Sequence, residues 1–291
     1  MKKVFIVGCG YIGGRVARQF VNQGANVTCL VRSDDHKAHL TADGITAVVC
    51  NLDDPSPIPL LDTSDSTLLY FVPPPGGGTT DTRARNFCAQ LAFSTPPATI
   101  VYTSATSVYS ETGGGVVTES SPTVPASAMG KRRLDAEAAF REYGALSGSS
   151  IIILRVSGIY GPGRLPQMQI MQRQPLLREE ESGPSNRIHA DDLARVCVAA
   201  TVKGKNGDIF NVSDGSPSSM TSYFNACADL LGQPRQPQVS MQEARQVMSP
   251  LMLSYVSESR IVDNSRMLQK LDIPLQYKNM HEGLPASLVQ D

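Results

Sequence analysis

The sequence predicts an α/β protein in which a doubly wound parallel sheet is joined to a smaller C-terminal lobe. Short apolar runs rich in β-branched residues recur through the first 160 residues, as is typical of strands buried on both faces. Helix-length segments separate these runs, which favours a parallel sheet with helices on both faces. After Gly161 the strand rhythm weakens and Pro, Gln and Met become frequent. We therefore expect a first domain over residues 1–160 and a mixed lobe over residues 161–291 that partly interleaves with it.

The elements of the first domain follow from apolar spacing and from glycine stops. Residues 4–7 form a β-branched run that ends at Gly8 and predict the first strand. Apolar residues then recur at helical spacing over residues 11–23, and Gly24 is a natural end for that helix. Further strands are predicted at residues 27–31, 46–50, 67–72, 99–103 and 151–156.

The C-terminal lobe carries weaker signals. Residues 209–212 indicate one returning strand. Residues 221–231 predict a helix with Thr221 or Ser222 as its cap and Gly232 as its end. No internal repeat is visible in the sequence.

Two low-complexity segments, residues 73–78 and 113–115, consist of proline and glycine or of glycine alone. We expect both to be loops. Both follow strand-like segments, and α/β sheets bind ligands beyond the ends of their strands.

Charge and hydropathy give no support to nucleic acid or a membrane as a partner. The 291 residues carry 26 Lys and Arg against 27 Asp and Glu, a formal charge of −1, so nothing attracts the chain to nucleic acid. No apolar run approaches the ~18 residues that a membrane helix needs. Residues 1–7 superficially resemble a signal peptide, but glycines break the apolar stretch and no small-residue cleavage site follows. The prediction is a cytoplasmic protein without a membrane partner.

The six cysteines form no Cys-x-x-Cys pair. Several lie in apolar, strand-like runs. Buried, reduced thiols are the favoured interpretation over disulfides or a metal site.

Residues 8–13 read Gly-Cys-Gly-Tyr-Ile-Gly, which is the pattern G-x-G-x-x-G. The pattern follows a predicted strand, opens a helix and precedes a second strand, the context of a dinucleotide-binding loop in a Rossmann fold. Gly8 permits the tight turn, Gly10 lets the backbone approach the pyrophosphate, and Gly13 lets the helix pack on the strand. Because helix N-termini bind anions, Tyr11 and Ile12 should also contact the cofactor.

The end of the second strand bears on the choice between NADP and NAD. An acid at that point would bind the ribose 2′-hydroxyl of NAD, whereas this chain has Arg32, a planar cation that suits a 2′-phosphate. Asp34 and Asp35 are a counter-signal, because a longer strand would offer one of them to NAD. We predict NADP and keep NAD open. Residues near the ends of the later strands should complete the cofactor site, namely Asn51, Leu52, Val72, Pro73 and Thr103.

The chain resembles the extended and atypical short-chain dehydrogenases/reductases, and among them the NAD-dependent epimerase/dehydratase group. The resemblance covers nearly the whole chain. Besides the glycine loop, its marks are residues 101–109, 155–163, 187–194, 211–214 and 282–284. Residues 70–74 further resemble an atypical subgroup in which prolines follow the fourth strand.

The family's chemistry uses Ser, Tyr and Lys, with the tyrosine as general acid/base and the lysine lowering its pKa. This chain departs from that pattern, because none of its nine tyrosines has a lysine four residues later. Lys131 falls at the lysine position, Ser127 at the tyrosine position and Ala105 at the serine position.

The candidate catalytic residues are therefore substitutes. Ser104 and Thr106 flank Ala105, Tyr109 is retained from the family's Val-Tyr-Gly, and Lys131 could act as a base if desolvated. A packing role for Tyr109 and an exposed position for Lys131 remain open. His189 and Asp191 resemble a structural histidine and a capping residue at a helix start, and Glu119 is expected to be solvated.

The resemblance implies an NADP-dependent oxidoreductase that acts on a small carbonyl, hydroxyl or sugar-like substrate with a non-standard acid/base. The alternative is a catalytically silent NAD(P)-binding sensor or regulatory protein, and a third reading is a scaffold with a vestigial glycine loop. Residues 165–185 and 221–257 should line the substrate pocket. Few basic residues other than Arg164 and Arg173 occur there, which disfavours a nucleotide-sugar diphosphate. Family members often dimerise, which leaves a homodimer open.

Overall fold

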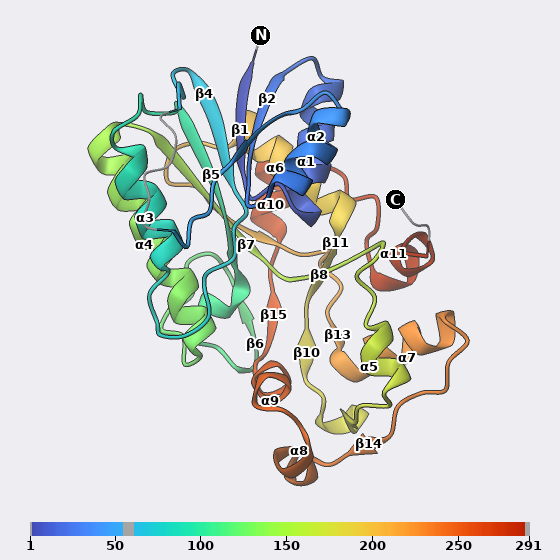
Figure 1. Cartoon of the computed structure of the whole chain (residues 1–291). Helices are drawn as coiled ribbons and strands as arrows, with labels where there is room; N and C mark the ends of the chain where they lie inside the picture. Colours follow the sequence, from blue (N-terminus) through green and yellow to red (C-terminus); the bar gives the residue numbers. More distant parts are fainter. Residues whose placement is uncertain (1, 55–60, 289–291) are drawn as a thin grey trace.

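The computed structural model of the chain describes residues 2–54 and 61–288. A seven-stranded sheet, parallel throughout, forms its centre (Figure 1). From edge to edge its strands are β12 (Ile209–Val212), β7 (Ser150–Val156), β5 (Thr99–Ala105), β4 (Ser66–Tyr70), β1 (Lys3–Val7), β2 (Asn26–Val31) and β3 (Thr46–Val49). The predicted doubly wound α/β fold is confirmed.

The order of the strands places a switch point between β1 and β4. The chain runs outward from β1 to β3, returns beside β1 as β4, and then runs outward to the opposite edge. Ligands of open α/β sheets bind where the order reverses, beyond the carboxyl ends of the strands.

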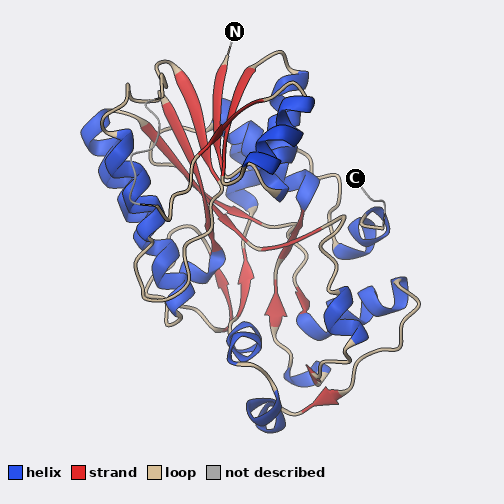
Figure 2. Cartoon of the chain, viewed as in Figure 1, coloured by secondary structure: helices blue, strands red, loops and turns tan. Residues whose placement is uncertain are grey.

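Helices cover both faces of the sheet (Figure 2). One face packs against α3 (Thr82–Leu91) and α4 (Ala128–Ser147), with Phe87 and Phe140 fully buried. The other face packs against α1 (Tyr11–Asn22), α2 (Asp34–Ala42), α6 (Ala190–Lys203) and α10 (Ser265–Leu271). The strands carry apolar residues in near-continuous runs because both of their faces are buried in this way.

The C-terminal lobe is built from short elements. Two-stranded sheets pair β8 (Gly158–Tyr160) with β11 (Arg187–His189), β10 (Pro184–Ser185) with β13 (Ser218–Ser219), β9 (Leu176–Leu177) with β14 (Gln238–Val239), and β6 (Gly113–Val117) with β15 (Ser259–Val262). Its helices are α5 (Gln167–Met171), α7 (Met220–Leu230), α8 (Met241–Val247), α9 (Pro250–Ser257) and α11 (Met280–Ala286). A separate apolar core around Tyr223 and Phe224 holds α5, α7 and α11 together.

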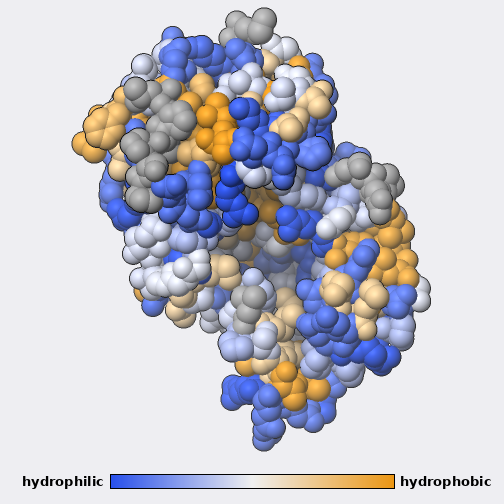
Figure 3. All heavy atoms as spheres, in the orientation of Figure 1, coloured by the Kyte–Doolittle hydropathy of each residue, from blue (hydrophilic) through white to orange (hydrophobic). Residues whose placement is uncertain are grey.

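The domain boundary near residue 160 stays a prediction. Three elements beyond it, β12, α6 and α10, belong to the sheet and its helical layer. Figure 3 shows the surface hollowed between the sheet-containing part and the lower lobe.

Two expectations about local structure were wrong. Residues 113–115 are not a loop but the start of β6, which pairs with β15 at Gly113, Val116 and Val117 and has an irregularity between them. The helix predicted at 221–231 is α7, and its cap is neither Thr221 nor Ser222 but Ser219, whose side chain accepts a hydrogen bond from the Ser222 backbone N–H. Thr221 instead donates from its hydroxyl to the backbone oxygen of Leu177, at 2.7 Å.

Candidate functional site

The glycine loop joins β1 to α1 at the switch point of the sheet, and crowding decides two of its glycines. Gly8 has a φ of +88°, and a Cβ there would lie 2.8 Å from the side chain of Val72. A Cβ at Gly13 would lie 2.4 Å from the backbone oxygen of Gly8. A Cβ at Gly10 would meet nothing within 4 Å, so open space faces this residue. This is the division of roles that a pyrophosphate-binding loop requires.

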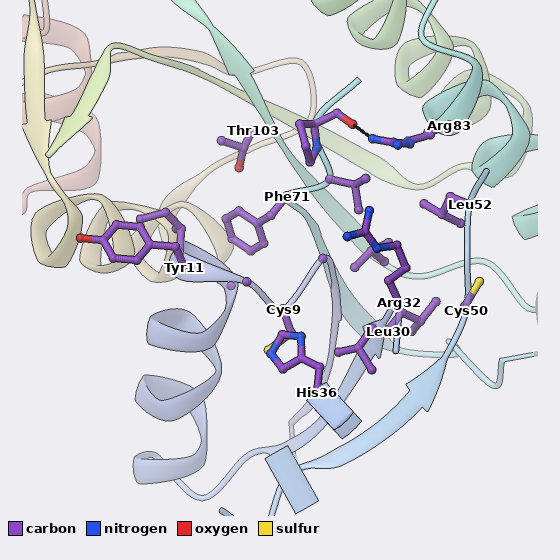
Figure 4. Close-up of a pocket in the computed structure, with 18 of the residues that line it drawn as sticks. Cys9, Tyr11, Leu30, Arg32, His36, Cys50, Leu52, Phe71, Arg83 and Thr103 are labelled. Carbon is purple, nitrogen blue, oxygen red and sulfur yellow. Dashed lines mark hydrogen bonds between the residues drawn. The ribbon is translucent and has the colours of Figure 1, made fainter. Parts of the chain in front are cut away.

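A cavity of about 690 Å³ lies beside this loop, and we call it the first cavity. Its walls come from the loop and from the carboxyl ends of β2, β3, β4 and β5 (Figure 4). All eleven residues that the sequence suggested for the cofactor line it: Gly8, Gly10, Tyr11, Ile12, Gly13, Arg32, Asn51, Leu52, Val72, Pro73 and Thr103.

The charged groups of the first cavity are mostly cationic. Arg32 follows β2 directly and reaches into the cavity, together with His36 from α2 (Figure 4). Asp34 and Asp35 lie exposed in the first turn of α2 and are not part of the cavity wall.

One carboxylate, Asp53, also lines the first cavity. Both of its oxygens accept hydrogen bonds from Arg83, at 2.6 Å each, and this guanidinium holds the pKa of Asp53 below its ordinary value. Arg83 also donates to the backbone oxygen of Pro73 at 2.9 Å. The charge of Asp53 is therefore already compensated.

A second cavity of about 400 Å³ adjoins the first, and Ile159 of β8 lines both. Its walls combine the segment after β5 with the lobe: Ala105, Thr106, Ser107, Met129, Val156, Ser157, Gly158, Ile159, Tyr160, Pro184, Ser185, Asn186, Arg187, Met220, Tyr223, Phe224, Tyr255, Glu258 and Arg260. The segments 165–185 and 221–257, expected to form this wall, contribute Pro184, Ser185, Tyr223, Phe224 and Tyr255.

Two buried arginines line the second cavity, and the sequence analysis had not assigned either to it. Arg187 donates to the Ser218 hydroxyl at 2.7 Å and lies over the ring of Tyr223. Arg260 donates to the backbone oxygens of Glu111 and Thr106 at 2.7 and 2.9 Å. Arg164 lines the first cavity instead. The sequence predicted few basic residues in this pocket besides Arg164 and Arg173, but Arg187 and Arg260, which lie outside segments 165–185 and 221–257, add two cations to its wall.

The four candidate catalytic residues are not brought together. Thr106 lines the second cavity. Ser104 is buried, and its hydroxyl donates to Glu137 at 2.8 Å. Tyr109 is buried and donates to the Asn211 side chain at 2.5 Å. Lys131 is exposed on α4 and is absent from the walls described for both cavities.

Tyr109 is also unsuited electrostatically to proton transfer. Burial raises its pKa, although the Arg155 guanidinium opposes this. An acid/base phenol needs the opposite shift, towards neutrality.

Glu119 and His189 have structural partners. A Glu119 carboxylate oxygen accepts from the Asn211 backbone N–H at 2.9 Å. His189 caps α6, since its Nδ1 accepts from the Asp191 backbone N–H, and this cap had been expected at Asp191. Asp191 pairs instead with Arg15, at 3.0 Å.

Sequence reasoning missed Arg133. It lies two residues beyond Lys131, lines the first cavity and donates to the backbone oxygen of Thr103 at 3.1 Å. The helical period of α4 could have predicted that Arg133 faces the sheet. The family motif ends at Lys131 and says nothing about residue 133.

Three hydroxyls next to the cavities are buried and have no hydrogen-bond partner among the described residues. They are Thr103 in the wall of the first cavity and Ser107 and Ser157 in that of the second. Buried polar groups are normally paired, so each of these oxygens is available to a ligand or to water.

The model of the NAD dependent epimerase/dehydratase family matches residues 84–213. Over these residues the chain is similar to the NAD-dependent epimerase/dehydratase family. It is 27% identical to Protein YeeZ of Escherichia coli (strain K12), over 95% of this chain and 97% of that protein.

Solved structures extend this similarity to the whole fold. A functionally unknown conserved protein from Silicibacter pomeroyi DSS superposes with a TM-score of 0.80 at 28% identity, covering 98% of each chain. A UDP-glucuronic acid 4-epimerase from Bacillus cereus in complex with NAD superposes with a TM-score of 0.75 at 18% identity, covering 98% of this chain and 97% of that one. The second likeness shows a shared overall fold.

The ranges that the structure describes contain neither a membrane-spanning helix nor a metal-binding cluster. No helix there has the length and apolarity to cross a membrane. No group of three or more His, Cys, Asp or Glu side chains there could hold a metal ion.

Proposed function

We propose that this protein is an enzyme of the epimerase/dehydratase type that binds NADP(H) in the first cavity and transfers hydride to or from a small ligand in the second. The observation that carries the proposal is the meeting of the two cavities at Ile159, next to the hydroxyl-rich segment after β5. A dinucleotide and a second ligand would then touch each other. The nicotinamide, when bound, supplies the redox chemistry.

The preference for NADP over NAD rests on Arg32. It lines the cavity with His36 at the end of β2, where an acid would be needed to bind an unphosphorylated ribose. The nearby acids give no support to NAD, because Asp34 and Asp35 are exposed and Asp53 is paired with Arg83. A guanidinium suits a phosphate dianion.

The second ligand is proposed to be a sugar-like carbonyl or hydroxyl compound that carries an anionic group. Arg187 and Arg260 supply buried positive charge, and Tyr223 and Phe224 supply flat apolar walls. This combination fits a ligand with both a charged and a planar or cyclic part.

The acid/base of this reaction is proposed to be non-standard. Thr106 and Ser107 line the second cavity and would donate hydrogen bonds to the reacting oxygen. An aliphatic hydroxyl polarises a carbonyl but is a poor proton source, so water would supply the proton. Turnover should therefore be slow beside that of an enzyme with a tuned tyrosine.

A sensor without turnover is the second candidate. The observation that favours it is the placement of Ser104, Tyr109 and Lys131 away from both cavities. A dinucleotide site without a tuned acid/base would report the redox state of the cofactor rather than change it.

Calorimetric titration with NADP⁺, NADPH, NAD⁺ and NADH tests the cofactor. We expect micromolar binding of both phosphorylated forms and weaker binding of the others. Arg32→Ala should weaken NADPH about tenfold and leave NADH nearly unchanged. Lys37→Ala is the matched control, because this neighbouring cation is exposed on α2 outside the described cavity wall. Equal loss of both cofactors in Arg32→Ala would overturn the 2′-phosphate assignment.

Assays against panels of carbonyl compounds and sugar nucleotides separate the two candidates. Turnover that falls in both Thr106→Val and Ser107→Ala, with NADPH affinity retained, supports the oxidoreductase. Absence of turnover together with binding of only one redox form supports the sensor.

A further inference from the structure

The glycine loop contains a cysteine whose sulfur lies against that of a second cysteine. Cys9 stands between Gly8 and Gly10, and Cys29 lies in β2. Their Sγ atoms are 3.0 Å apart, and Cys29 donates its S–H to Cys9. Neither side chain has a role in the proposed hydride transfer.

The sheet brings these two residues together. β1 and β2 are parallel neighbours, and the backbone N–H of Gly8 donates to the oxygen of Leu30 at 3.1 Å. The loop therefore leaves the sheet directly beside Cys29. A disulfide needs the sulfurs about 2.05 Å apart, so roughly 1 Å of approach separates the two thiols from a bond.

Access to the pair is one-sided. Cys9 lines the first cavity and also a smaller one of about 190 Å³ between α1 and α2. Cys9 is itself 2% exposed, and Cys29 is fully buried, with 0% of its surface exposed and no place in the described cavity walls. A small oxidant would therefore reach Cys9 first, and Cys29 would be the thiol that resolves the product.

The surroundings of Cys9 favour the same order. The hydrogen bond from Cys29 lowers the pKa of Cys9, burial opposes this, and the Arg18 guanidinium adds to the lowering. The pKa of Cys29 is raised by the same hydrogen bond and by burial. Since the thiolate is the reactive form, Cys9 is the nucleophile of the pair.

We propose that Cys9 and Cys29 are a reversible oxidation site whose disulfide weakens dinucleotide binding in the first cavity. With hydrogen peroxide as oxidant, the sulfur of Cys9 takes one peroxide oxygen to become a sulfenic acid, and water leaves. The thiol of Cys29 then attacks that sulfur, the S–S bond forms, and the hydroxyl departs as a second water. Two thiols are oxidised and one peroxide is reduced to two waters. A thiol reductant reverses the change by exchange.

The disulfide should weaken dinucleotide binding because the glycine loop is closely packed and cannot move without shifting its backbone. The backbone on both sides of Cys9 is closely packed, since a Cβ at Gly8 would lie 2.8 Å from the Val72 side chain and one at Gly13 would lie 2.4 Å from the Gly8 backbone oxygen. Drawing Cys9 towards β2 must then shift its own backbone and that of Gly10, which faces the open space for the pyrophosphate. This step of the inference rests on the proposed function.

The first experiment asks whether the bond forms. Purified protein is treated with hydrogen peroxide, digested without reduction and mapped by mass spectrometry. We expect a peptide pair linked through Cys9 and Cys29 with a loss of 2 Da, reversed by dithiothreitol. Cys9→Ser should lack it, and Cys29→Ala provides a second variant if the serine change impairs folding. Cys50→Ser should still form the linked peptide pair, although Cys50 is less buried than Cys9 and Cys29. Absence of the linked peptide in wild-type protein overturns the inference.

The second experiment measures NADPH affinity in the oxidised and reduced states. Oxidised wild type should bind at least about tenfold more weakly, whereas Cys9→Ser should bind equally before and after peroxide. By linkage, saturating NADP⁺ should raise the midpoint potential of the pair, by about 30 mV for each tenfold difference in affinity, because the cofactor stabilises the reduced dithiol form.

The outcomes separate the switch from the proposed function. A linked peptide with unchanged affinity overturns the switch. Reduced protein that binds no NADP(H) at all overturns the proposed function and the switch with it, while the linked peptide would still support the oxidation site.

Discussion

At the scale of single residues, one glycine of the glycine loop is required by neighbouring protein atoms, and another faces space that a ligand could fill. Gly13 is required by the backbone, since a methyl group there would overlap the oxygen of Gly8. Gly10 is not crowded by any protein atom. Packing within the protein therefore constrains Gly13, whereas the approach of a ligand would constrain Gly10.

Substituting each glycine by alanine should separate these constraints. Gly13→Ala should lower the free energy of unfolding by about 1–3 kcal/mol, because the overlap forces the helix away from the loop. Gly10→Ala should change it by less than ~1 kcal/mol yet weaken NADPH at least about tenfold. Urea unfolding and calorimetry measure the two effects. Similar unfolding losses in both variants would contradict this account.

Asp214, just after β12, is a buried carboxyl group whose surroundings disfavour its ionised form. Burial and the nearby Asp192 raise its pKa to about 7, although the Ser216 backbone N–H and Arg187 oppose the rise. One of its oxygens accepts from Ser216 at 2.9 Å, and the other is buried without a hydrogen-bond partner among the described residues.

The raised pKa predicts a direction for pH dependence. An unfolded aspartate titrates near 3.9, so between about pH 4 and pH 7 the folded state binds more protons and its stability falls as pH rises. Asp214→Asn should remove this slope. The free energy of unfolding of the variant should exceed that of wild type most above pH 7, by at most about 4 kcal/mol. Urea midpoints at pH 5 and pH 8 measure it. An unchanged difference between these midpoints in the variant would refute the assignment.

At the scale of elements, α4 explains why the family's catalytic pattern is not rebuilt here. Ser127 is its N-cap, and its hydroxyl accepts from the Gly130 backbone N–H at 3.2 Å. Arg133 and Glu137, four residues apart, share the side that faces the sheet, and Glu137 is buried in an ion pair with Arg155 at 2.9 Å. Lys131 lies off that side and is exposed.

The role of Ser127 as a cap can be tested directly. Ser127→Ala should lower the free energy of unfolding by about 1 kcal/mol, because one N–H at the start of α4 loses its partner. Ser127→Asp, an equally good cap, should stay close to wild type. NADPH affinity should be unchanged in both. A loss of turnover in Ser127→Asp without a loss of stability would instead assign the hydroxyl to the reaction.

At the scale of the whole molecule, the second cavity exists because distant segments close around it. β15 pairs with β6, and Arg260 of β15 reaches back to backbone oxygens on both sides of the loop after β5. Asn186 donates to the backbone oxygen of Arg260 at 2.8 Å and accepts from the Val262 N–H at 2.9 Å. The lobe and the sheet domain are joined through these contacts.

Arg260→Ala should therefore affect more than the cavity. It removes the partner of two backbone oxygens and of Glu258, so we expect a loss of about 2–4 kcal/mol in unfolding free energy. Arg235→Ala is the control, since Arg235 forms an exposed ion pair with Asp229 and should contribute little. Thermal and urea unfolding compare the two variants. Equal stability would show that Arg260 does not join the two parts.

The sequence by itself determined the parts of this protein that depend on short-range pattern. Apolar periodicity locates the buried strands and the helix after the glycine loop. The eleven cofactor residues suggested by the sequence lie in that loop or near the ends of β2 to β5, and all of them line the first cavity. Parallel strands bring their carboxyl ends to one edge, so separate short motifs converge without further information.

Only the tertiary structure decided which side chains meet across long stretches of chain. Arg187 and Arg260 reach the second cavity, Ser104 turns to Glu137, Tyr109 turns to Asn211, and Cys9 meets Cys29. The three glycines at 113–115 became a strand because β15, more than 140 residues later, offered a partner. The physical reason is that burial and pairing depend on the neighbour in space, and no local spacing encodes which distant segment that neighbour will be.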